Sequence, residues 1–377
     1  MIIKKAPSNF ENIFFFFLAV HAATGILKET NLNPALIDHV VMGNVITSST
    51  DTMYGARHLA LKIGCDVTTP GYVVNRLCGS GIQIMMDAKN MIELGQANCV
   101  LVAGTENMSM APHLTYGARF GTKYGSLQVV DMLLDALTDK YTQTPMGITA
   151  ENLAKEYTIT REESDAFAYA SHAKATKAYN ENLFDGEIVG IEIKNNLITR
   201  DEHLRSETTM AELQKLRPAF AKDGVVTPAS ASGVVDGACA VLIANEEFCK
   251  KNNLTPLAEI IDGSVIGVDP TIMGIGPVPA IKNLLEKNKM SLSQIDFIEI
   301  NEAFAPQTLS CMKALEIDPA KLNVWGGAVA LGHPLAASGT RIALTVARQL
   351  QHYKKEYAIA SACIGGGQGI ALLLKRV

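Results

Sequence analysis

The chain has 377 residues, enough for two or three compact units that each bury an apolar core. Its 48% hydrophobic and 19% charged residues and its net charge of −5, without a basic stripe, are typical of an ordinary soluble protein and argue against nucleic acid as a partner. The seven cysteines are odd in number, widely spaced and free of any C-x-x-C pair, which argues against a disulfide framework or a structural zinc site and favours a reducing compartment.

The N-terminus is unusual, with two lysines followed by the apolar run 13–20, "IFFFFLAV". A secretory signal has similar features, and Ala22 and Ala23 lie near a suitable cleavage point. The run is far shorter than the roughly 20 residues of a membrane span. Its length favours a buried strand or an atypical gene start over a signal, so we expect a protein that is neither secreted nor membrane-bound.

Two segments of the chain resemble each other. Residues 32–45 and 290–304 both run from a polar helix end through Ile-Asp into an apolar strand, and each is followed by a Gly-rich turn that opens a long apolar helix. Strands at 99–104 and 357–363 come next. Recurring strand–helix units of this kind predict an α/β fold with buried strands, and the approximate duplication predicts two such halves packed together.

The segment between the two halves has a different amino-acid composition. Residues 105 to about 235 are rich in Met, Gly, Thr and Pro, and contain one amphipathic helix at 160–182 with Thr160 and Glu163 as its capping box. We expect an inserted loop subdomain that covers a site. Residues 234–245 return to the pattern of a buried strand.

The first candidate for chemistry is Cys78 in "NRLCGSG". It precedes apolar residues at helical spacing, with Gly95 as a stop signal, and so lies at a predicted helix N-terminus. The free N–H groups and dipole there favour a thiolate, and the neighbouring glycines allow close approach of a ligand. A buried structural cysteine is the equally weighted alternative.

Three further motifs place polar groups next to glycines or strand ends. His333 in "ALGHPLAASG" is a candidate base, Cys363 in "ACIGGGQG" adjoins backbone N–H groups suited to an oxyanion, and Asn301 and Glu302 end an apolar strand. The structural alternatives are a turn histidine for His333, a tight hairpin for the Cys363 motif, and a helix cap for Asn301 and Glu302. The usual nucleotide-binding and metal-binding fingerprints are absent from the sequence, and this inventory requires no metal or redox cofactor.

Taken in order, "NRLCGSG", "NEAFA", "GGAVALGHPLAASG" and "CIGGGQG" resemble the motifs of the thiolase family, and the likeness runs from about residue 18 to the end. The resemblance implies an α/β fold of two duplicated βαβαβαββ halves, packed as a five-layered αβαβα core. It implies an N-terminal domain over 1–248, which includes the insert at about 105–235, and a C-terminal domain over 254–377.

The resemblance also implies roles for individual residues. The cysteine matching Cys78 is acylated, His333 takes its proton, and Cys363 moves the α-proton of the substrate. Asn301 holds a water that forms one oxyanion hole with His333, and the N–H groups of Cys78 and Gly365 form the other. Coenzyme A binds as a substrate, with no further cofactor, at the positions matching Arg205, Ser232, Met146, Phe220, Met273, Ala303 and Phe304.

The implied activity is that of an acyl-CoA C-acyltransferase, which cleaves a 3-ketoacyl-CoA to acetyl-CoA and a shortened acyl-CoA or condenses two acetyl-CoA molecules. "MYGARHLALKIG" and "FGTKYGS" resemble the mitochondrial 3-ketoacyl-CoA thiolases of fatty acid β-oxidation. We therefore expect a homodimer or homotetramer in the mitochondrial matrix or a bacterial cytoplasm. The alternatives are a β-ketoacyl-synthase-like condensing enzyme, which lacks the second catalytic cysteine, and a catalytically impaired CoA-binding protein with a disrupted N-terminus.

Three segments depart from the family pattern. Residues 227–233 read "TPASASG" where many members have T-A-G-N-A-S-G, and Pro145 stands where some short-chain members have histidine. The opening strand and its R-T-P-[FI]-G segment are not readable in residues 1–17. The run 13–20 is a candidate replacement for that strand, because consecutive Phe residues suit a strand that is apolar on both faces.

Overall fold

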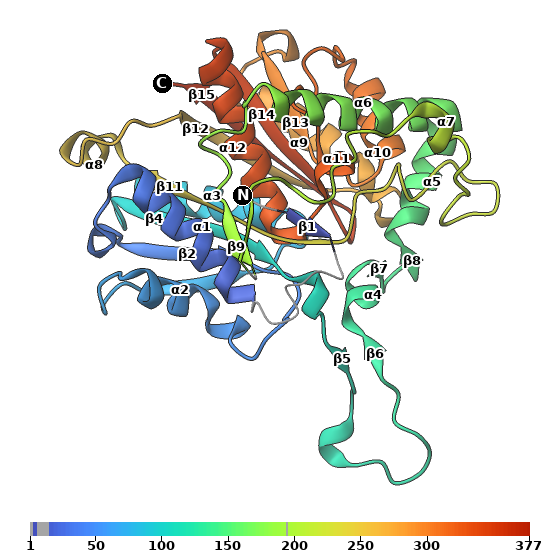
Figure 1. The fold of residues 1–377 in the computed structure, drawn as a ribbon, viewed down its shortest axis with the longest axis horizontal. Helices are drawn as coiled ribbons and strands as arrows, with labels where there is room; N and C mark the ends of the chain where they lie inside the picture. The colour runs from blue at the N-terminus through green and yellow to red at the C-terminus, as the bar shows by residue number, and fades with distance from the viewer. Residues whose placement is uncertain (1–2, 6–14, 194) are drawn as a thin grey trace.

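The structure, a computed structural model, describes residues 3–5, 15–193 and 195–377. Two β-sheets lie face to face with helices between and outside them (Figure 1). The first sheet has the strand order β1-β11-β4-β2-β3 and the second β12-β15-β14-β13.

The first sheet is built from residues on both sides of the insert. Its strands are β1 (Ile3–Lys5), β2 (His39–Gly43), β3 (Gly71–Val74), β4 (Cys99–Glu106) and β11 (Val235–Ala244). Strand β2 runs parallel to β3 and β4, whereas β11 runs antiparallel to β4 and β1. All eight residues of β4 are buried, as expected for a central strand covered on both faces.

The second sheet repeats this plan. Its strands are β12 (Ala258–Gly267), β13 (Phe297–Ile300), β14 (Tyr357–Ile364) and β15 (Gln368–Arg376). Strand β13 is parallel to β14, and β15 is antiparallel to both β14 and β12. Ile298 of β13 also forms an isolated parallel bridge with Leu322.

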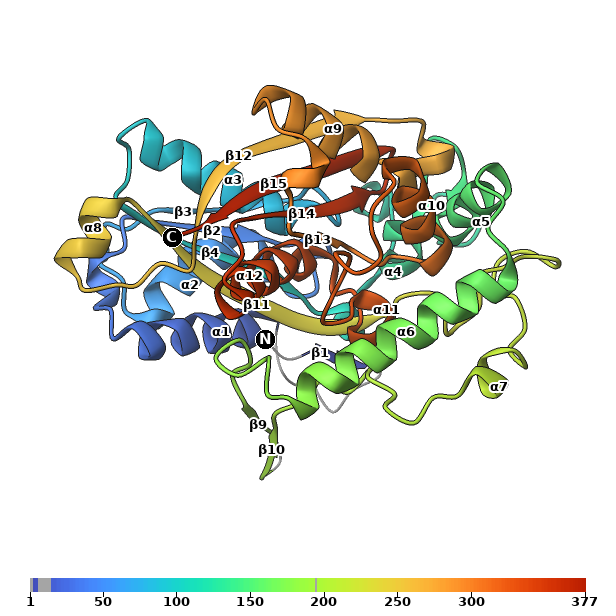
Figure 2. The ribbon, with the colours of Figure 1, turned by 90° about the horizontal axis from the view of Figure 1, so that it is seen from above.

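The helices form the remaining layers (Figures 1 and 2). Helices α3 (Ser80–Glu93) and α12 (Leu335–Tyr353) pack on each other between the sheets, and each contacts both sheets. Helices α1 (Phe15–Thr30) and α2 (Gly55–Ile63) cover the outer face of the first sheet, while α9 (Pro277–Lys287) and α10 (Ala305–Leu315) cover that of the second. The predicted five-layered αβαβα core is confirmed.

The two central helices approach each other through glycine. A Cβ atom added to Gly81 would lie 2.4 Å from the backbone nitrogen of Thr340, and one added to Gly339 would lie 2.5 Å from that of Ile82. Both contacts are with backbone atoms, which have no flexible side chain to move aside. The absence of side chains here sets the separation of the two helix N-termini, and hence of the loops that precede them.

We expect Gly81→Ala to destabilise the fold by about 1–3 kcal/mol, because the added methyl forces the α3 and α12 backbones apart. Urea unfolding measures the change. The matched control is Gly267→Ala, whose Cβ would meet only one atom, at 3.9 Å, and which should be near neutral. Equal stability of the Gly81→Ala protein would show that the helix spacing is not fixed by this contact.

The insert leaves the sheets after β4 and returns at β11. It includes α5 (Met146–Glu156), α6 (Arg161–Asn180) and a long arm that carries the paired strands β5 (His113–Leu114) and β6 (Val130–Asp131). The arm projects from the body at the bottom of Figure 1. The smaller elements are α4 (Met132–Ala136), β7 (Thr138–Asp139), β8 (Thr144–Pro145), β9 (Ile191–Ile193), β10 (Asn196–Ile198), α7 (Met210–Leu213), α8 (Glu246–Lys251) and α11 (Ala328–Leu331).

Local predictions have mixed outcomes. The capping box of Thr160 and Glu163 is confirmed at the start of α6. The strand predicted for the run 13–20 is wrong from Phe15 on, because these residues begin α1, with Ala19 and Ala23 packed against the first sheet. Ile13 and Phe14 lie outside the described residues. Within the described part of the chain, no helix is both long and apolar enough to cross a membrane.

Candidate active site

The site lies where parallel strands of both sheets end. Cys78 follows β3, Glu106 ends β4, Asn301 follows β13 and Cys363 lies near the end of β14. The N–H of Asn301 donates to the carbonyl of Ser361 at 2.9 Å, which joins the ends of β13 and β14. In α/β sheets this edge is the usual place for a ligand.

The turn that carries Cys78 is held in an unusual backbone conformation. Leu77 has φ = 47°, a left-handed value that costs a non-glycine residue about 1–2 kcal/mol. Asn75 Oδ1 accepts from Leu77 N at 3.0 Å, and Ser80 Oγ accepts from Arg76 N at 2.8 Å and donates to Leu77 O at 2.7 Å. These bonds hold the strained turn, as is common where a functional side chain must be aimed.

The sulfur of Cys78 is surrounded by groups from the other half of the chain. The N–H of Gly365 donates to it, and the Cys363 thiol lies close enough that Cys78 raises the pKa of Cys363. Burial of the sulfur, together with the negative charge of Glu106, raises the pKa of Cys78 to about 11. The N–H groups of Gly365 and Cys78 act in the opposite direction, because they favour the thiolate. The predicted ionised thiol is therefore wrong for the free protein, since desolvation outweighs the two backbone N–H contacts.

Cys363 is fully buried, packed with Ala150, Met273, Ala303 and Phe304. Burial, with the proximity of Cys78, raises the pKa of Cys363 well above its ordinary value. The glycines after it form the tight turn between β14 and β15, with φ of 79° at Gly366 and 81° at Gly367. The motif is a tight hairpin, as the structural alternative predicted. The same hairpin also points the Gly365 N–H at Cys78, so the two hypotheses for this motif do not exclude each other.

His333 is buried and neutral. Burial and, to a lesser extent, the charge of Arg341 lower its pKa to about 3. Its Nε2 accepts from the Asn301 side-chain amide at 3.4 Å, and its Nδ1 lies 2.6 Å from Ser338 Oγ. Because an amide nitrogen can only donate, Nε2 is unprotonated and Nδ1–H donates to Ser338. The imidazole therefore has one unprotonated nitrogen, Nε2, whose contact with the Asn301 amide is long.

Ser338, which the sequence analysis missed, fixes the orientation of the His333 ring through its hydrogen bond to Nδ1. We expect Ser338→Ala to lower kcat about 10- to 100-fold with little change in KM, because a hydrogen bond to a charged imidazolium contributes about 1.5–3 kcal/mol. Steady-state kinetics measure both constants. Ser338→Thr keeps the hydroxyl and should recover part of the loss, whereas an unchanged kcat in the alanine variant would contradict the role.

Two buried carboxylates hold the site together, of which Glu106 escaped prediction and Glu302 was named with Asn301. Glu106 accepts from the Asn44 side chain and from the backbone of Val45, Ile46 and Ala336 at 2.9–3.3 Å, so it fixes the start of α12 to the first sheet. Burial raises the pKa of Glu106 to about 7. The position of Glu106 at the end of the "LVAGTE" strand is the sequence signal that would have identified it.

Glu302 does the same for the second sheet. It accepts from Ser171 Oγ at 2.7 Å, Asn323 Nδ2 at 2.9 Å and Val329 N at 3.1 Å. These bonds fix α6 and α11 to the end of β13. The neighbouring Asn301 is buried, and its Oδ1 has no hydrogen-bond partner among the described residues, so it is free to hold a water.

The predicted substrate-binding residues fall into three groups. Met146, Met273, Ala303 and Phe304 form one apolar cluster with Cys363. Phe220, 41% exposed, packs edge-on against Phe304 with ring centroids 5.9 Å apart.

Ser232 and Arg205 lie further out. Ser232 N donates to Ala303 O at 3.0 Å, and the exposed Arg205 is two residues from His203, whose ring covers Gly233. The altered loop 227–233 keeps its backbone pairing with 303–305, because Ser230 O accepts from Ala305 N at 2.8 Å.

Two cavities are described. The smaller, about 330 Å³, is lined by Leu77, Met146, Gly365 and Gly366 together with 135–141, and so opens beside both cysteine motifs. The larger, about 810 Å³, contains none of the predicted site residues. The described residues also include no cluster of three or more His, Cys, Asp or Glu placed to hold a metal ion.

Comparison with known proteins identifies the family. The family models for the thiolase N-terminal domain and the thiolase C-terminal domain match residues 3–247 and 254–376. The chain belongs to the thiolase family. The fold and the acyltransferase class predicted from the four motifs are therefore confirmed.

Individual relatives agree with this assignment. The chain is 48% identical to the bovine (Bos taurus) mitochondrial 3-ketoacyl-CoA thiolase over 95% of its own length and 91% of that protein. It is 44% identical to a probable acetyl-CoA acyltransferase of Staphylococcus aureus over 97% and 94%. The crystal structure of the human mitochondrial 3-ketoacyl-CoA thiolase in complex with CoA matches with a TM-score of 0.98 at 46% identity, covering 100% of this chain and 96% of that one.

Proposed function

We propose that this thiolase cleaves 3-ketoacyl-CoA substrates with coenzyme A, through an acyl group on Cys78. The observation that supports it most is the meeting of two thiols with different surroundings. Cys78 is partly exposed and receives the Gly365 N–H, while Cys363 is sealed in an apolar cluster beside it. One thiol is placed to take up the acyl group and the other to carry a proton.

The first half-reaction begins with a proton transfer. His333 Nε2 takes the proton of Cys78, and the thiolate attacks C3 of the substrate. The C2–C3 bond breaks, its electron pair passes to C2, and Cys363 supplies the proton that completes acetyl-CoA. The Gly365 and Cys78 N–H groups form one oxyanion hole. The Asn301-held water and His333 form the other.

The second half-reaction restores the protein. The Cys363 thiolate takes the proton of an incoming coenzyme A, whose sulfur attacks the acyl carbon. Cys78 leaves as a thiolate and recovers its proton from the His333 imidazolium. Because a thiolate is both a good nucleophile and a good leaving group, one residue serves both half-reactions.

Coenzyme A in this proposal enters past Arg205 and Ser232, with its thiol end among Met146, Met273 and Phe304. A guanidinium suits the phosphate end of the nucleotide, while the apolar cluster suits the pantetheine arm. The 330 Å³ cavity beside Leu77 and Gly365 is the proposed place for the acyl chain. The likeness to mitochondrial 3-ketoacyl-CoA thiolases supports fatty acid β-oxidation as the role, in a mitochondrial matrix or a bacterial cytoplasm.

Two assays test the proposal. Thiolysis across acetoacetyl-CoA and longer 3-ketoacyl-CoA substrates should show turnover, with the preferred length set by the 330 Å³ cavity. Intact-mass spectrometry after incubation with acetyl-CoA should show one added acetyl group, located on Cys78. A protein that binds CoA but gains no acetyl group would instead be the catalytically impaired alternative.

We also propose that the chain assembles as a homodimer or homotetramer. The arm between β5 and β6 exposes Tyr116, Phe120 and Tyr124, the last two at 90% and 99%. Exposed apolar groups this concentrated are typical of an interface. Light scattering should give a multiple of the 40.5 kDa chain, and replacing residues 116–129 with a short Gly-Ser linker should lower the order of assembly.

A further inference from the structure

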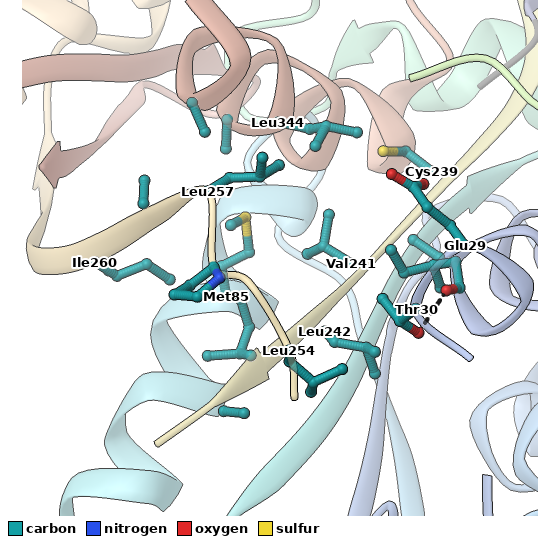
Figure 3. A pocket seen from close by; sticks show the side chains of 18 of the residues that line it. Glu29, Thr30, Met85, Cys239, Val241, Leu242, Leu254, Leu257, Ile260 and Leu344 are labelled. Carbon is teal, nitrogen blue, oxygen red and sulfur yellow. Dashed lines mark hydrogen bonds between the residues drawn. The ribbon is translucent and has the colours of Figure 1, made fainter. Parts of the chain in front are cut away.

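The two cavities lie in different parts of the molecule. The larger, drawn in Figure 3, lies against β11 between α1 and α3. None of its lining residues belongs to the turns at 75–81 and 363–369 that carry the two thiols. The smaller cavity is lined by Leu77 and Gly365, one from each of these turns. An acyl chain that starts at the sulfur of Cys78 therefore extends into the smaller cavity rather than the larger.

The smaller cavity runs from the thiol site to the turn between β7 and β8. Leu77 precedes Cys78 in the chain, and the N–H of Gly365 donates to the Cys78 sulfur. The lining also includes Met146 and residues 138–141 of the turn. A volume of about 330 Å³ is within the range of small-molecule pockets, which begins at roughly 300 Å³, and is larger than a two-carbon acetyl group requires. The turn therefore lies where the far carbons of a longer acyl chain would be.

The charged groups at this cavity already have partners. Lys140, the one cation in the described lining, lies 2.6 Å from Asp135. Asp139 is buried, and its Oδ1 accepts from the backbone N–H groups of Tyr141 at 2.8 Å and Thr142 at 3.0 Å. A carboxylate on the substrate would meet two acidic groups and no unpaired cation in that lining. The cavity therefore suits an uncharged acyl chain.

The backbone of the turn holds Tyr141 in a fixed position. Strands β7 and β8 pair antiparallel on either side of it. The two N–H groups bound by the Asp139 carboxylate close the turn, and Gln143 takes a left-handed φ of 54°. These contacts involve the backbone of Tyr141 and not its ring. A substitution of the ring therefore leaves the bonds that shape the turn in place.

The ring of Tyr141 is exposed although it lines the cavity. It is 91% accessible to solvent in the single chain. An aromatic ring offers a large and rigid apolar surface, which is favourably covered by other apolar groups. A chain that fills the cavity covers the ring and shields its own far carbons from water. An acetyl group stays beside the sulfur of Cys78 and leaves the ring exposed.

We propose that Tyr141 sets the acyl-chain preference of this thiolase, as the residue on which the far carbons of an uncharged acyl chain pack. The chain is the one that the proposed function places on Cys78, so this inference rests on that proposal. Substrates long enough to reach the turn between β7 and β8 gain binding energy from the ring, and acetoacetyl-CoA does not. Tyr141 contacts the substrate but takes no part in proton or acyl transfer.

Thiolysis kinetics of the full-length protein test this role, with acetoacetyl-CoA and 3-ketodecanoyl-CoA as substrates. Tyr141→Ala should lower kcat/KM about tenfold more for the ten-carbon substrate than for acetoacetyl-CoA, because a small apolar contact in a pocket changes kcat/KM by roughly 10- to 200-fold. Tyr141→Phe keeps the ring and should keep the ratio of the unaltered protein. The matched control is Tyr169→Ala, which removes an exposed tyrosine of α6 outside the cavity and should also keep that ratio.

A second pair of substrates tests the charge of the chain. 3-Ketoadipyl-CoA and 3-ketohexanoyl-CoA both carry six-carbon acyl groups, but the first ends in a carboxylate. The unaltered protein should cleave 3-ketohexanoyl-CoA with at least tenfold higher kcat/KM. Equal or better cleavage of 3-ketoadipyl-CoA would show that the cavity accepts a charged chain and would overturn the proposal in this respect.

The possible failures can be told apart. No turnover of any substrate by the unaltered protein would overturn the proposed function and this inference with it. Turnover with an equal loss for both substrates in Tyr141→Ala would overturn the role of Tyr141 alone. A lower mass of Tyr141→Ala in light scattering, with no change in the substrate ratio, would assign the exposed ring to a subunit interface instead.

Discussion

Replacement of Cys78 by alanine should abolish acylation and lower thiolysis by at least about 10³-fold, equivalent to about 4 kcal/mol of lost transition-state stabilisation. The reason is that no other thiol is placed to form the acyl intermediate. Cys363 is fully buried, and Gly365 N–H points to the sulfur of Cys78. Intact-mass spectrometry with acetyl-CoA and a thiolysis assay measure the two effects.

Replacement of Cys363 by alanine should give a different defect. This variant should still be acetylated on Cys78, because His333 and the Gly365 N–H remain. It should fail to exchange the α-protons of acetyl-CoA with deuterium, since the proton carrier is gone. The control is Cys249→Ala, which removes a partly buried thiol from a region outside the site and should behave as the unaltered protein. Turnover by the Cys78→Ala protein would refute the assignment of the nucleophile.

The second prediction concerns pH. In the free protein the rate of Cys78 alkylation by iodoacetamide should rise about tenfold per pH unit through neutrality and level off only near pH 11. The thiolate is the reactive form, and a pKa of about 11 leaves roughly one part in 10⁴ ionised at pH 7. Peptide mapping of the alkylated protein separates Cys78 from the other cysteines.

A cysteine that is already ionised in the free protein would show the opposite dependence of alkylation rate on pH. A preformed thiolate–imidazolium pair would react at a constant rate across neutral pH, with a fall only at acid pH. The structure argues against it from both partners, because burial raises the pKa of Cys78 and lowers that of His333 to about 3. A plateau between pH 6 and 9 would therefore contradict the protonated Cys78 and neutral His333 described above.

Much of the fold and the site could be predicted because the informative patterns are local. The strands at 99–104 and 357–363 are runs of buried residues, and the glycines around Cys78, His333 and Cys363 mark turns at strand and helix ends. Four such motifs in order were enough to indicate the family. The roles assigned to single residues, and the domain limits at 248 and 254, stay predictions for the experiments above.

What could not be predicted depends on contacts between distant segments. The helix dipole at Cys78 can be read from sequence, whereas the desolvation that outweighs it depends on residues 45–46 after β2, on the start of α12 and on the glycine turn after Cys363. Ser338 and Glu106 act through partners that only the folded chain brings near. The run 13–20 reads equally as a strand or a helix, since its four Phe residues carry no period, and from Phe15 on the first sheet decides in favour of a helix.

The raised pKa of Cys78 has a consequence for chemical durability. Peroxide oxidises thiolates far faster than thiols, so a sulfur that keeps its proton resists conversion to sulfenic and sulfinic acids. In the proposed mechanism the nucleophile forms only when His333 takes the proton of Cys78, so the resting protein keeps this sulfur in its less reactive form. In a compartment where oxidants are produced, such an enzyme should survive longest when idle and be most vulnerable in mid-turnover.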